Sequence, residues 1–353
     1  MTRPEPFLTE DGVRTGTTGR DLRSGRAFAA RPGRALIVMR DDMAYVVAGL
    51  AARLSGHAPV AWPVLITALS VAYRSFQEDV RRALYDCAAG AERPDLHIVD
   101  GIAVGQAVRA RIHTAKAISL DPLVEGVAAL GISRGFELGG RRPCGLVARP
   151  GFPPVASQAI HLRQTLMDDE CTLVEDDIHT GGTIAGVLGI LAGAGVRVAK
   201  VVTGIVAGPA VLGSLGVPVE PVLRYVGVPD RIDVADPRNF LLGVSGLVVR
   251  LPTGCWGRAP YWLPFVTTSA RVVVDPAQDD KFARVMVRAN ARFYERVERS
   301  THCRIRVGHL HPAVRMLLAT TVSASAETRV GHLLDGLADR LDRGDRTAGA
   351  GAR

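Results

Sequence analysis

Residues 171–183, C-T-L-V-E-D-D-I-H-T-G-G-T, form the stretch that decides the fold expected for this chain. The stretch opens with mostly apolar residues, as at the end of a buried strand. Three carboxylates at 175–177 follow, and then come His179 and the small-residue loop 180–183. The apolar residues 184–191 predict a helix. A strand, a glycine-rich turn and a helix amino terminus together favour an anion, because backbone N–H groups and the helix dipole converge there.

The acids directly before this loop narrow the choice of ligand. A site for phosphate alone disfavours neighbouring carboxylates, whereas a sugar phosphate offers hydroxyls or a Mg²⁺ ion to the acids and a phosphate to the loop. The P-loop pattern is excluded because no lysine follows the glycines, and the dinucleotide pattern G-x-G-x-x-G is absent between residues 171 and 195. The alternative is an ordinary strand–turn–helix corner with a glycine turn.

The stretch resembles the 5-phosphoribosyl pyrophosphate (PRPP) signature of type I phosphoribosyltransferases. That signature has four mostly apolar residues, two acids, three variable residues and then Thr-Gly-x-Thr. The resemblance implies that Glu175 and Asp176 bind the ribose 2′ and 3′ hydroxyls. It also implies that the loop binds the 5′-phosphate. The expected PRPP-binding residues are Glu175, Asp176, Asp177, His179, Thr180, Gly181, Gly182 and Thr183.

The resemblance implies transfer of a 5-phosphoribosyl group from PRPP to a nucleobase or a specialised metabolite, with release of pyrophosphate. Mg²⁺ is the expected cofactor and arrives with PRPP, so no protein ligand is assigned to it. His179 stands where hypoxanthine-guanine enzymes carry an aspartate that handles the base proton, and a histidine accepts a proton at neutral pH. Glu175, Asp176 and His179 are the candidate catalytic residues, although His179 alternatively only packs in the loop.

Two other functions remain open at this point. One is a non-catalytic regulatory protein that binds PRPP on the same fold, which predicts a DNA-binding segment; residues 1–33 show no clear helix-turn-helix. The other is an α/β protein of a different kind, whose loop binds another phosphate.

Two arginines compete for the pyrophosphate. Residues 35–39 predict a strand, and Arg40 follows at the start of a turn before a helix over 43–54. The segment I-S-R-G-F at 132–136 resembles the pyrophosphate loop of adenine phosphoribosyltransferases and makes Arg134 the second candidate. Each has a plain alternative as a solvated arginine in a turn. Only one of them fits the family position, and the sequence does not choose between them.

Phe240 is the candidate for contact with the acceptor. The segment F-L-L-G at 240–243 resembles the base-stacking segment of hypoxanthine-guanine enzymes. The alternative is a phenylalanine of the hydrophobic core.

The alternation of strand and helix patterns after residue 183 predicts an α/β fold with a parallel sheet. The resemblance implies that this fold is of the type I phosphoribosyltransferase kind. We expect a parallel twisted sheet with flanking helices, hood segments and a helical C-terminal part. The expected organisation is a flexible N-terminal arm at 1–33, the α/β domain at 34–266, a mostly helical extension at 267–340 and a disordered tail at 341–353.

Composition restricts the partners. The 353 residues carry a net charge of +8, and only three of the 43 basic residues are lysines. Because the arginines are scattered, we expect no nucleic-acid partner.

Five distant cysteines without a C-x-x-C motif favour the cytoplasm, and no apolar run is long enough for a membrane span. The spacing of His302, Cys303, His309 and His311 matches no common metal site. A homodimer is the expected assembly.

Overall fold

The structure, a computed structural model, divides the chain into two compact units that are each built from separate segments. Unit 1 contains residues 1–41, 90–134 and 144–235, and unit 2 contains residues 42–89, 135–143 and 236–353. These limits do not coincide with the division at 266 that the sequence pattern favoured. The structure describes residues 13–15, 22, 27–29, 31, 34–90, 92–113, 116–121, 127–166, 170–208, 211–226 and 232–345. Most of the predicted arm at 1–33 and the end of the predicted tail, from 346, lie outside these residues.

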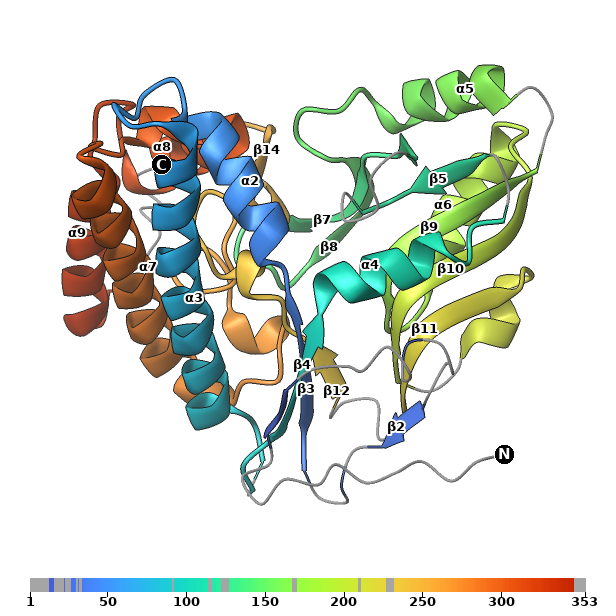
Figure 1. Cartoon of the computed structure of the whole chain (residues 1–353), viewed down its shortest axis with the longest axis horizontal. Coiled ribbons are helices and arrows are strands. Elements are labelled where there is room, and N and C mark those ends of the chain that lie inside the picture. Colours follow the sequence, from blue (N-terminus) through green and yellow to red (C-terminus); the bar gives the residue numbers. More distant parts are fainter. Residues whose placement is uncertain are drawn as a thin grey trace. The chain divides into compact units, whose positions relative to one another are not determined.

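The larger sheet of unit 1 is parallel throughout its described strands, in the order β2-β11-β10-β9-β5-β6. β9 carries the acidic stretch and lies between β5 and β10 (Figure 1). The strands are β2 (Ala27–Ala29), β5 (Ala117–Ser119), β6 (Ala128–Ala129), β9 (Cys171–Ile178), β10 (Val198–Ala207) and β11 (Val219–Val226).

Both faces of this sheet are covered, which explains why its central strands are apolar without alternation. The neighbours Leu173 and Val174 belong to two different hydrophobic clusters, because successive side chains point to opposite faces. On the Leu173 side lie α5 (Val155–Leu166) and α6 (Gly182–Gly193). On the Val174 side lies α4 (Gly101–Arg109).

A second parallel sheet of unit 1 packs around α4, in the order β1-β4-β3-β12. Residues of β3, β4 and β12 share one core cluster with α4 and with the larger sheet. Unit 1 is therefore an α/β arrangement with mostly parallel sheets and flanking helices, as the sequence predicted. The strands of this second sheet are β1 (Val13–Thr15), β3 (Leu36–Asp41), β4 (Asp95–Asp100) and β12 (Ile232–Val234).

Unit 2 is mainly helical. Figure 1 shows α3, α7 and α9 side by side, and α2 packs against α3. The long helix α7 begins with two aspartates, which complement the positive end of its dipole, and it buries one stripe of side chains. The helices are α2 (Met43–Leu54), α3 (Trp62–Cys87), α7 (Asp279–Thr301), α8 (Pro312–Val322) and α9 (Val330–Asp342).

Strands also contribute to unit 2. β13 (Leu247–Arg250) pairs antiparallel with β14 (Trp256–Ala259) and parallel with the last residues of β7 (Ile132–Glu137). The limits of the units fall inside β7 and at the start of β8 (Pro143–Ala148).

A buried polar group fixes the start of α2 within unit 2. The Asp42 carboxylate accepts hydrogen bonds from the Tyr73 hydroxyl at 2.6 Å and from the Arg238 backbone N–H at 3.0 Å. Arg238 in turn lies 3.3 Å from the Asp236 carboxylate. Burial, followed by the charge of Asp236, raises the pKa of Asp42 to about 7.

Several predicted elements are confirmed and others are new. The patterns of residues 43–54, 64–87 and 279–299 predict helices, and these are α2, α3 and α7 in the structure. The pattern of residues 198–207 predicts a strand, and β10 has those bounds. The prediction of helices in the C-terminal part is also confirmed. However, α7 packs against α3 from the first quarter of the chain, so these helices share a core with an earlier segment. The sequence analysis did not predict α5 and α8.

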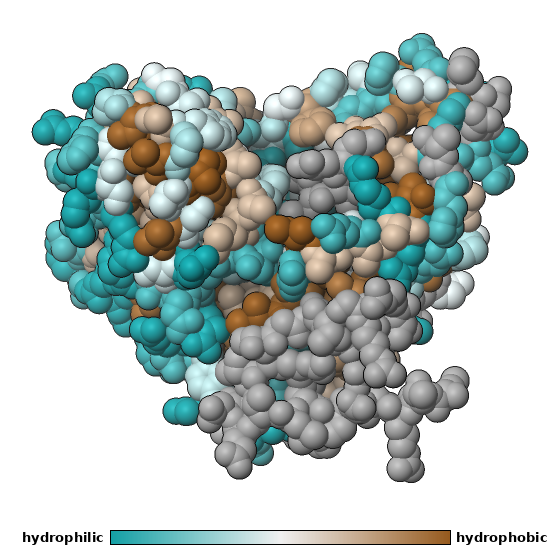
Figure 2. Space-filling view, in the orientation of Figure 1, coloured by the Kyte–Doolittle hydropathy of each residue, from teal (hydrophilic) through white to brown (hydrophobic). Residues whose placement is uncertain are grey.

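None of the helices in the described part of the chain combines the length and the apolar character that a membrane crossing requires. Unit 2 does expose apolar side chains on α3, where Trp62, Val64 and Val71 are 49%, 48% and 55% exposed. Figure 2 shows hydrophobic surface where α2 and the first turns of α3 lie.

The close approach of β10 to β9 gives the first prediction. A Cβ at Gly204 would lie 2.8 Å from the Asp176 carbonyl oxygen and 2.9 Å from the Val104 side chain. We expect Gly204→Ala to lower the free energy of unfolding by about 1–3 kcal/mol, because backbone and core must both shift. Urea unfolding monitored by circular dichroism measures the change.

Gly189→Ala is the matched control, because a Cβ at this exposed position of α6 meets nothing within 4 Å. We expect it to leave stability unchanged or to raise it by up to about 1 kcal/mol, since alanine favours helix. Equal effects of the two substitutions would contradict the close strand packing.

Candidate functional site

The site is built at the carboxyl end of β9. The strand ends at Ile178, and α6 begins at Gly182. Gly181 adopts a left-handed conformation with φ of 76°, which turns the chain from the strand into the helix. The N-cap residue of α6 is Gly181, which has no side chain to accept from the first backbone N–H groups of the helix. These N–H groups favour an anion at this position.

A buried arginine from the second sheet holds the carboxylates of β9. Arg40 lies at the end of β3, is only 2% exposed and donates to the Asp176 carboxylate at 2.7 Å. Its distance to the Asp177 carboxylate is 3.5 Å. The Asp177 side chain is the more exposed of the two, at 31% against 12%. The folded chain thus brings Arg40 into contact with Asp176 and Asp177, which lie 136 and 137 positions later in the sequence.

Glu175 is buried next to these acids and carries the most perturbed charge of the site. One of its carboxylate oxygens accepts a hydrogen bond from the Asp176 backbone N–H at 3.0 Å. Burial raises the pKa of Glu175 well above its ordinary value, and the charge of Asp176 adds to the increase. Asp177 and Asp121 raise it further. Glu175 therefore holds its proton to a higher pH than an exposed glutamate.

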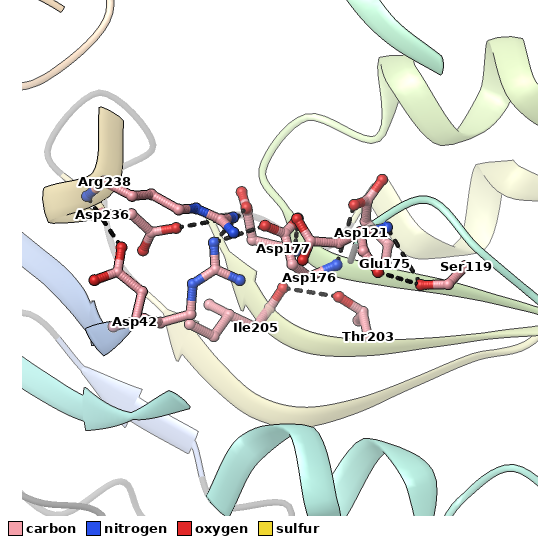
Figure 3. A network of polar contacts seen from close by, with 11 residues as sticks. Asp42, Ser119, Asp121, Glu175, Asp176, Asp177, Thr203, Ile205, Asp236 and Arg238 are labelled. Atoms are coloured by element: carbon pink, nitrogen blue, oxygen red, sulfur yellow. Dashed lines mark hydrogen bonds and ion pairs between the residues drawn. The ribbon is translucent and has the colours of Figure 1, made fainter. Parts of the chain in front are cut away.

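Asp121 is a site residue that the sequence analysis missed. It follows β5, the neighbour of β9, and is 6% exposed. The Ser119 hydroxyl donates to the Asp121 carbonyl oxygen at 2.6 Å, and the Leu120 N–H donates to the Val174 carbonyl at 2.9 Å. Figure 3 shows Ser119, Asp121 and Glu175 at the same edge of the sheet. The available signal was an acid directly after a short apolar run, but three strand residues are too few for a periodic pattern.

The remaining residues of the stretch 171–183 form the loop between β9 and α6 and the first residues of the helix. His179 and Thr180 are exposed, Gly182 is exposed and Thr183 is half-buried. The His179 ring lies beside Gly208 at the end of β10, where a Cβ would be 3.5 Å from the ring. The structure therefore places His179 at the rim of the carboxyl edge, accessible to solvent.

The other predicted site residues have different surroundings. Arg134 is exposed and lies within β7, the strand that contains the segment resembling the pyrophosphate-loop segment of adenine phosphoribosyltransferases. Phe240 belongs to unit 2 and is 0% exposed, and its ring packs against Tyr261 and Phe282. No face of the Phe240 ring is open to a ligand, so its environment is that of the core phenylalanine named as the alternative. Arg40, in contrast, is in direct contact with the acidic stretch.

Comparisons of the chain with protein-family models, with curated proteins and with solved structures find no match. Among the described residues, no group of three or more His, Cys, Asp and Glu side chains is arranged to hold a metal ion. The geometry of the carboxyl edge is therefore what bears on function.

The raised pKa of Glu175 predicts how stability changes with pH. The folded protein keeps this proton at pH values where the unfolded chain, with an ordinary pKa of 4.5, has lost it. Linkage makes the free energy of unfolding fall as pH rises from 4.5 towards the folded pKa, by about 1.4 kcal/mol per pH unit for one group. We expect Glu175→Gln to reduce this slope, as measured by urea unfolding at a series of pH values.

Asp42, whose pKa is also raised, makes the free energy of unfolding fall with pH in the same way. This contribution is the same in the wild type and in Glu175→Gln, so it cancels when the two slopes are compared. Glu220→Gln on β11, whose side chain is 44% exposed, is the control and should keep the wild-type slope. Identical slopes for Glu175→Gln and the wild type would show that Glu175 is ionised in the folded state.

Proposed function

We propose that the chain is a phosphoribosyltransferase that transfers the 5-phosphoribosyl group of PRPP to an acceptor and releases pyrophosphate. One observation carries the proposal. Paired carboxylates end the central parallel strand β9, and an uncapped helix amino terminus follows after a short loop. Ligands of parallel α/β sheets bind at this edge, where the carboxyl ends of the strands meet.

The two halves of the site match the two ends of a ribose 5-phosphate group. The loop and the first turn of α6 supply backbone N–H groups to the 5′-phosphate, and Gly181 allows its close approach. Glu175 and Asp176 accept hydrogen bonds from the ribose hydroxyls. Arg40 fixes the Asp176 carboxylate by a charge-assisted hydrogen bond. In this proposal Arg40 therefore positions the acids, and Arg134 remains the candidate for contact with pyrophosphate.

The acidic edge also fits Mg²⁺ brought by PRPP. Asp121, Glu175, Asp176 and Asp177 are not arranged as a metal-binding cluster, but their carboxyl groups favour a cation that the ligand carries. Arg40 is a cation within hydrogen-bond distance of Asp176 and Asp177. A bound divalent ion would lower the mutual repulsion that raises the pKa of Glu175. When bound, the ion supplies charge neutralisation to the leaving pyrophosphate.

The protein groups perform binding, orientation and proton transfer. The carboxylates and the loop hold the sugar at both ends, which orients C1 towards an acceptor. The bond from C1 to pyrophosphate breaks, the bond from C1 to the acceptor forms, and the acceptor loses a proton. His179 is exposed at the rim of the site and is the side chain that we assign to take this proton.

Isothermal titration of the full chain with PRPP and Mg²⁺ tests the binding step. We expect the double substitution Glu175→Gln and Asp176→Asn to weaken binding at least about tenfold, because ribose loses a charge-assisted hydrogen bond to Asp176 and the carboxyl group of Glu175. We expect Gly181→Ala to weaken it as well, since alanine opposes the left-handed turn under the phosphate.

Gly195→Ala is the matched control, because Gly195 has a φ of 77° beyond the other end of α6, away from the loop. It carries the same backbone strain and should leave PRPP affinity unchanged. Absence of PRPP binding to the wild type, or equal loss in both glycine variants, would refute the proposed site. Pyrophosphate release in the presence of candidate nucleobases then identifies the acceptor.

The role of His179 gives a separate prediction. We expect His179→Ala to lower kcat by about 100-fold, the range of general base catalysis, and to leave PRPP affinity unchanged. Steady-state pyrophosphate release and calorimetry measure the two quantities. Equal loss of turnover and affinity, or loss of neither, would contradict a proton-accepting role for His179.

A further inference from the structure

Unit 2 contains a polar cavity that the proposed reaction does not use. Its volume is about 520 Å³. Segments that are far apart in the sequence line it: the turn after α2, the segment between α7 and α8, and the turn before α9. The lining residues are Gly56, His57, Arg304, Arg306, Gly308, His309, Ala326 and Glu327.

Two histidines of this cavity are stacked face to face. The ring centroids of His57 and His309 are 4.0 Å apart, and the ring planes differ by 5°. Burial lowers the pKa of His309, and the charges of His57 and Arg306 lower it further, against a smaller opposing effect of Glu327. Two imidazolium ions at this distance repel each other strongly, so protonation of the pair requires a neighbouring anion.

The cavity also contains more cations than anions. Arg304 is exposed, and its guanidinium has no hydrogen-bond or ion-pair partner among the described residues. Arg306 pairs with Glu327, which is the only carboxylate among the lining residues. The positive field continues along the chain, because burial and the charges of Arg258, Arg53 and Arg315 lower the pKa of His311 to about 4.

We propose that this cavity binds the phosphate group of a small phosphorylated ligand, between the His57–His309 pair and Arg304. A phosphate dianion accepts hydrogen bonds from several directions and balances more than one positive charge, which suits donors from separate segments. Arg304 is the uncommitted guanidinium for this contact. Arg306 adds a second one when the anion competes with Glu327.

Binding at this site is coupled to proton uptake by His309. The groups that face His309 are His57 from the turn after α2, Arg304 and Arg306 from its own segment, and Glu327 from the turn before α9. A bound dianion offsets the repulsion of His309 by His57 and by the arginines, so it raises the pKa of His309. Affinity for a dianion therefore increases as pH falls through the histidine range.

Nuclear magnetic resonance of the full chain, with ¹³C-labelled histidine, reads this site directly. The signals of His57 and His309 are assigned from His57→Gln and His309→Gln, and the probes are inorganic phosphate and sulfate. We expect both anions to shift the two signals saturably. Sulfate remains a dianion throughout, and we expect it to bind at least about fivefold more tightly at about pH 6 than at about pH 8.

Matched substitutions separate a site from general charge effects. We expect Arg304→Gln to weaken binding about tenfold, and Glu327→Gln to strengthen it about threefold because Arg306 is released. Arg288→Gln on α7 is the control, since Arg288 is similarly exposed and pairs with Asp342 away from the cavity. Unshifted His57 and His309 signals, or equal affinity of the Arg304 and Arg288 variants, would overturn the proposal.

The variant Gly181→Ala tests whether this site is independent of the loop in unit 1. The variant should retain the phosphate response of His57 and His309 even if PRPP binding is lost, and loss of that response would overturn the assignment to unit 2. The affinities of the cavity for glycerol 3-phosphate and for inorganic phosphate are then compared to identify the class of ligand. Tighter binding of the ester indicates a phosphorylated metabolite, and equal binding indicates free phosphate.

Discussion

The burial of acidic side chains at the carboxyl end of β9 is the constraint on which the candidate site of unit 1 depends. Asp121, Asp176 and Asp177 lie close enough to Glu175 to raise its pKa, and Arg40 is a cation within hydrogen-bond distance of Asp176 and Asp177. Such a concentration of like charge opposes folding unless protons, cations or hydroxyl donors balance it. The arrangement therefore favours a ligand that brings hydroxyl groups and a metal ion, as PRPP does.

The surrounding architecture holds these charges in place. Parallel strands covered on both faces keep β9 and β10 rigid, and the missing side chain of Gly204 lets β10 approach the backbone of Asp176 closely. Arg40 comes from a different sheet, so its pair with Asp176 also joins the carboxyl ends of the two sheets. The acids and the start of α6 are consequently positioned by the fold of unit 1 itself.

Unit 2 differs in its charge and in its architecture. Its helices come from segments more than 190 residues apart, and its cavity contains two arginines and two histidines against one glutamate. An anionic ligand is the partner that this charge balance favours. Unit 1 offers an acidic edge and unit 2 offers a basic cavity, so the chain presents two chemically opposite surfaces to small molecules.

The sequence by itself determined the elements with strong local patterns. The mostly apolar run of β10, the periodic stripes of α3 and α7, and the strand, loop and helix around residues 171–193 were all predicted, because periodicity and turn chemistry are local properties. Only the tertiary structure decided that Arg40 contacts the acids, that Asp121 joins them, and that Phe240 is enclosed. These outcomes rest on contacts between residues far apart in the chain, and no local pattern encodes which distant charge or ring will fill a buried space.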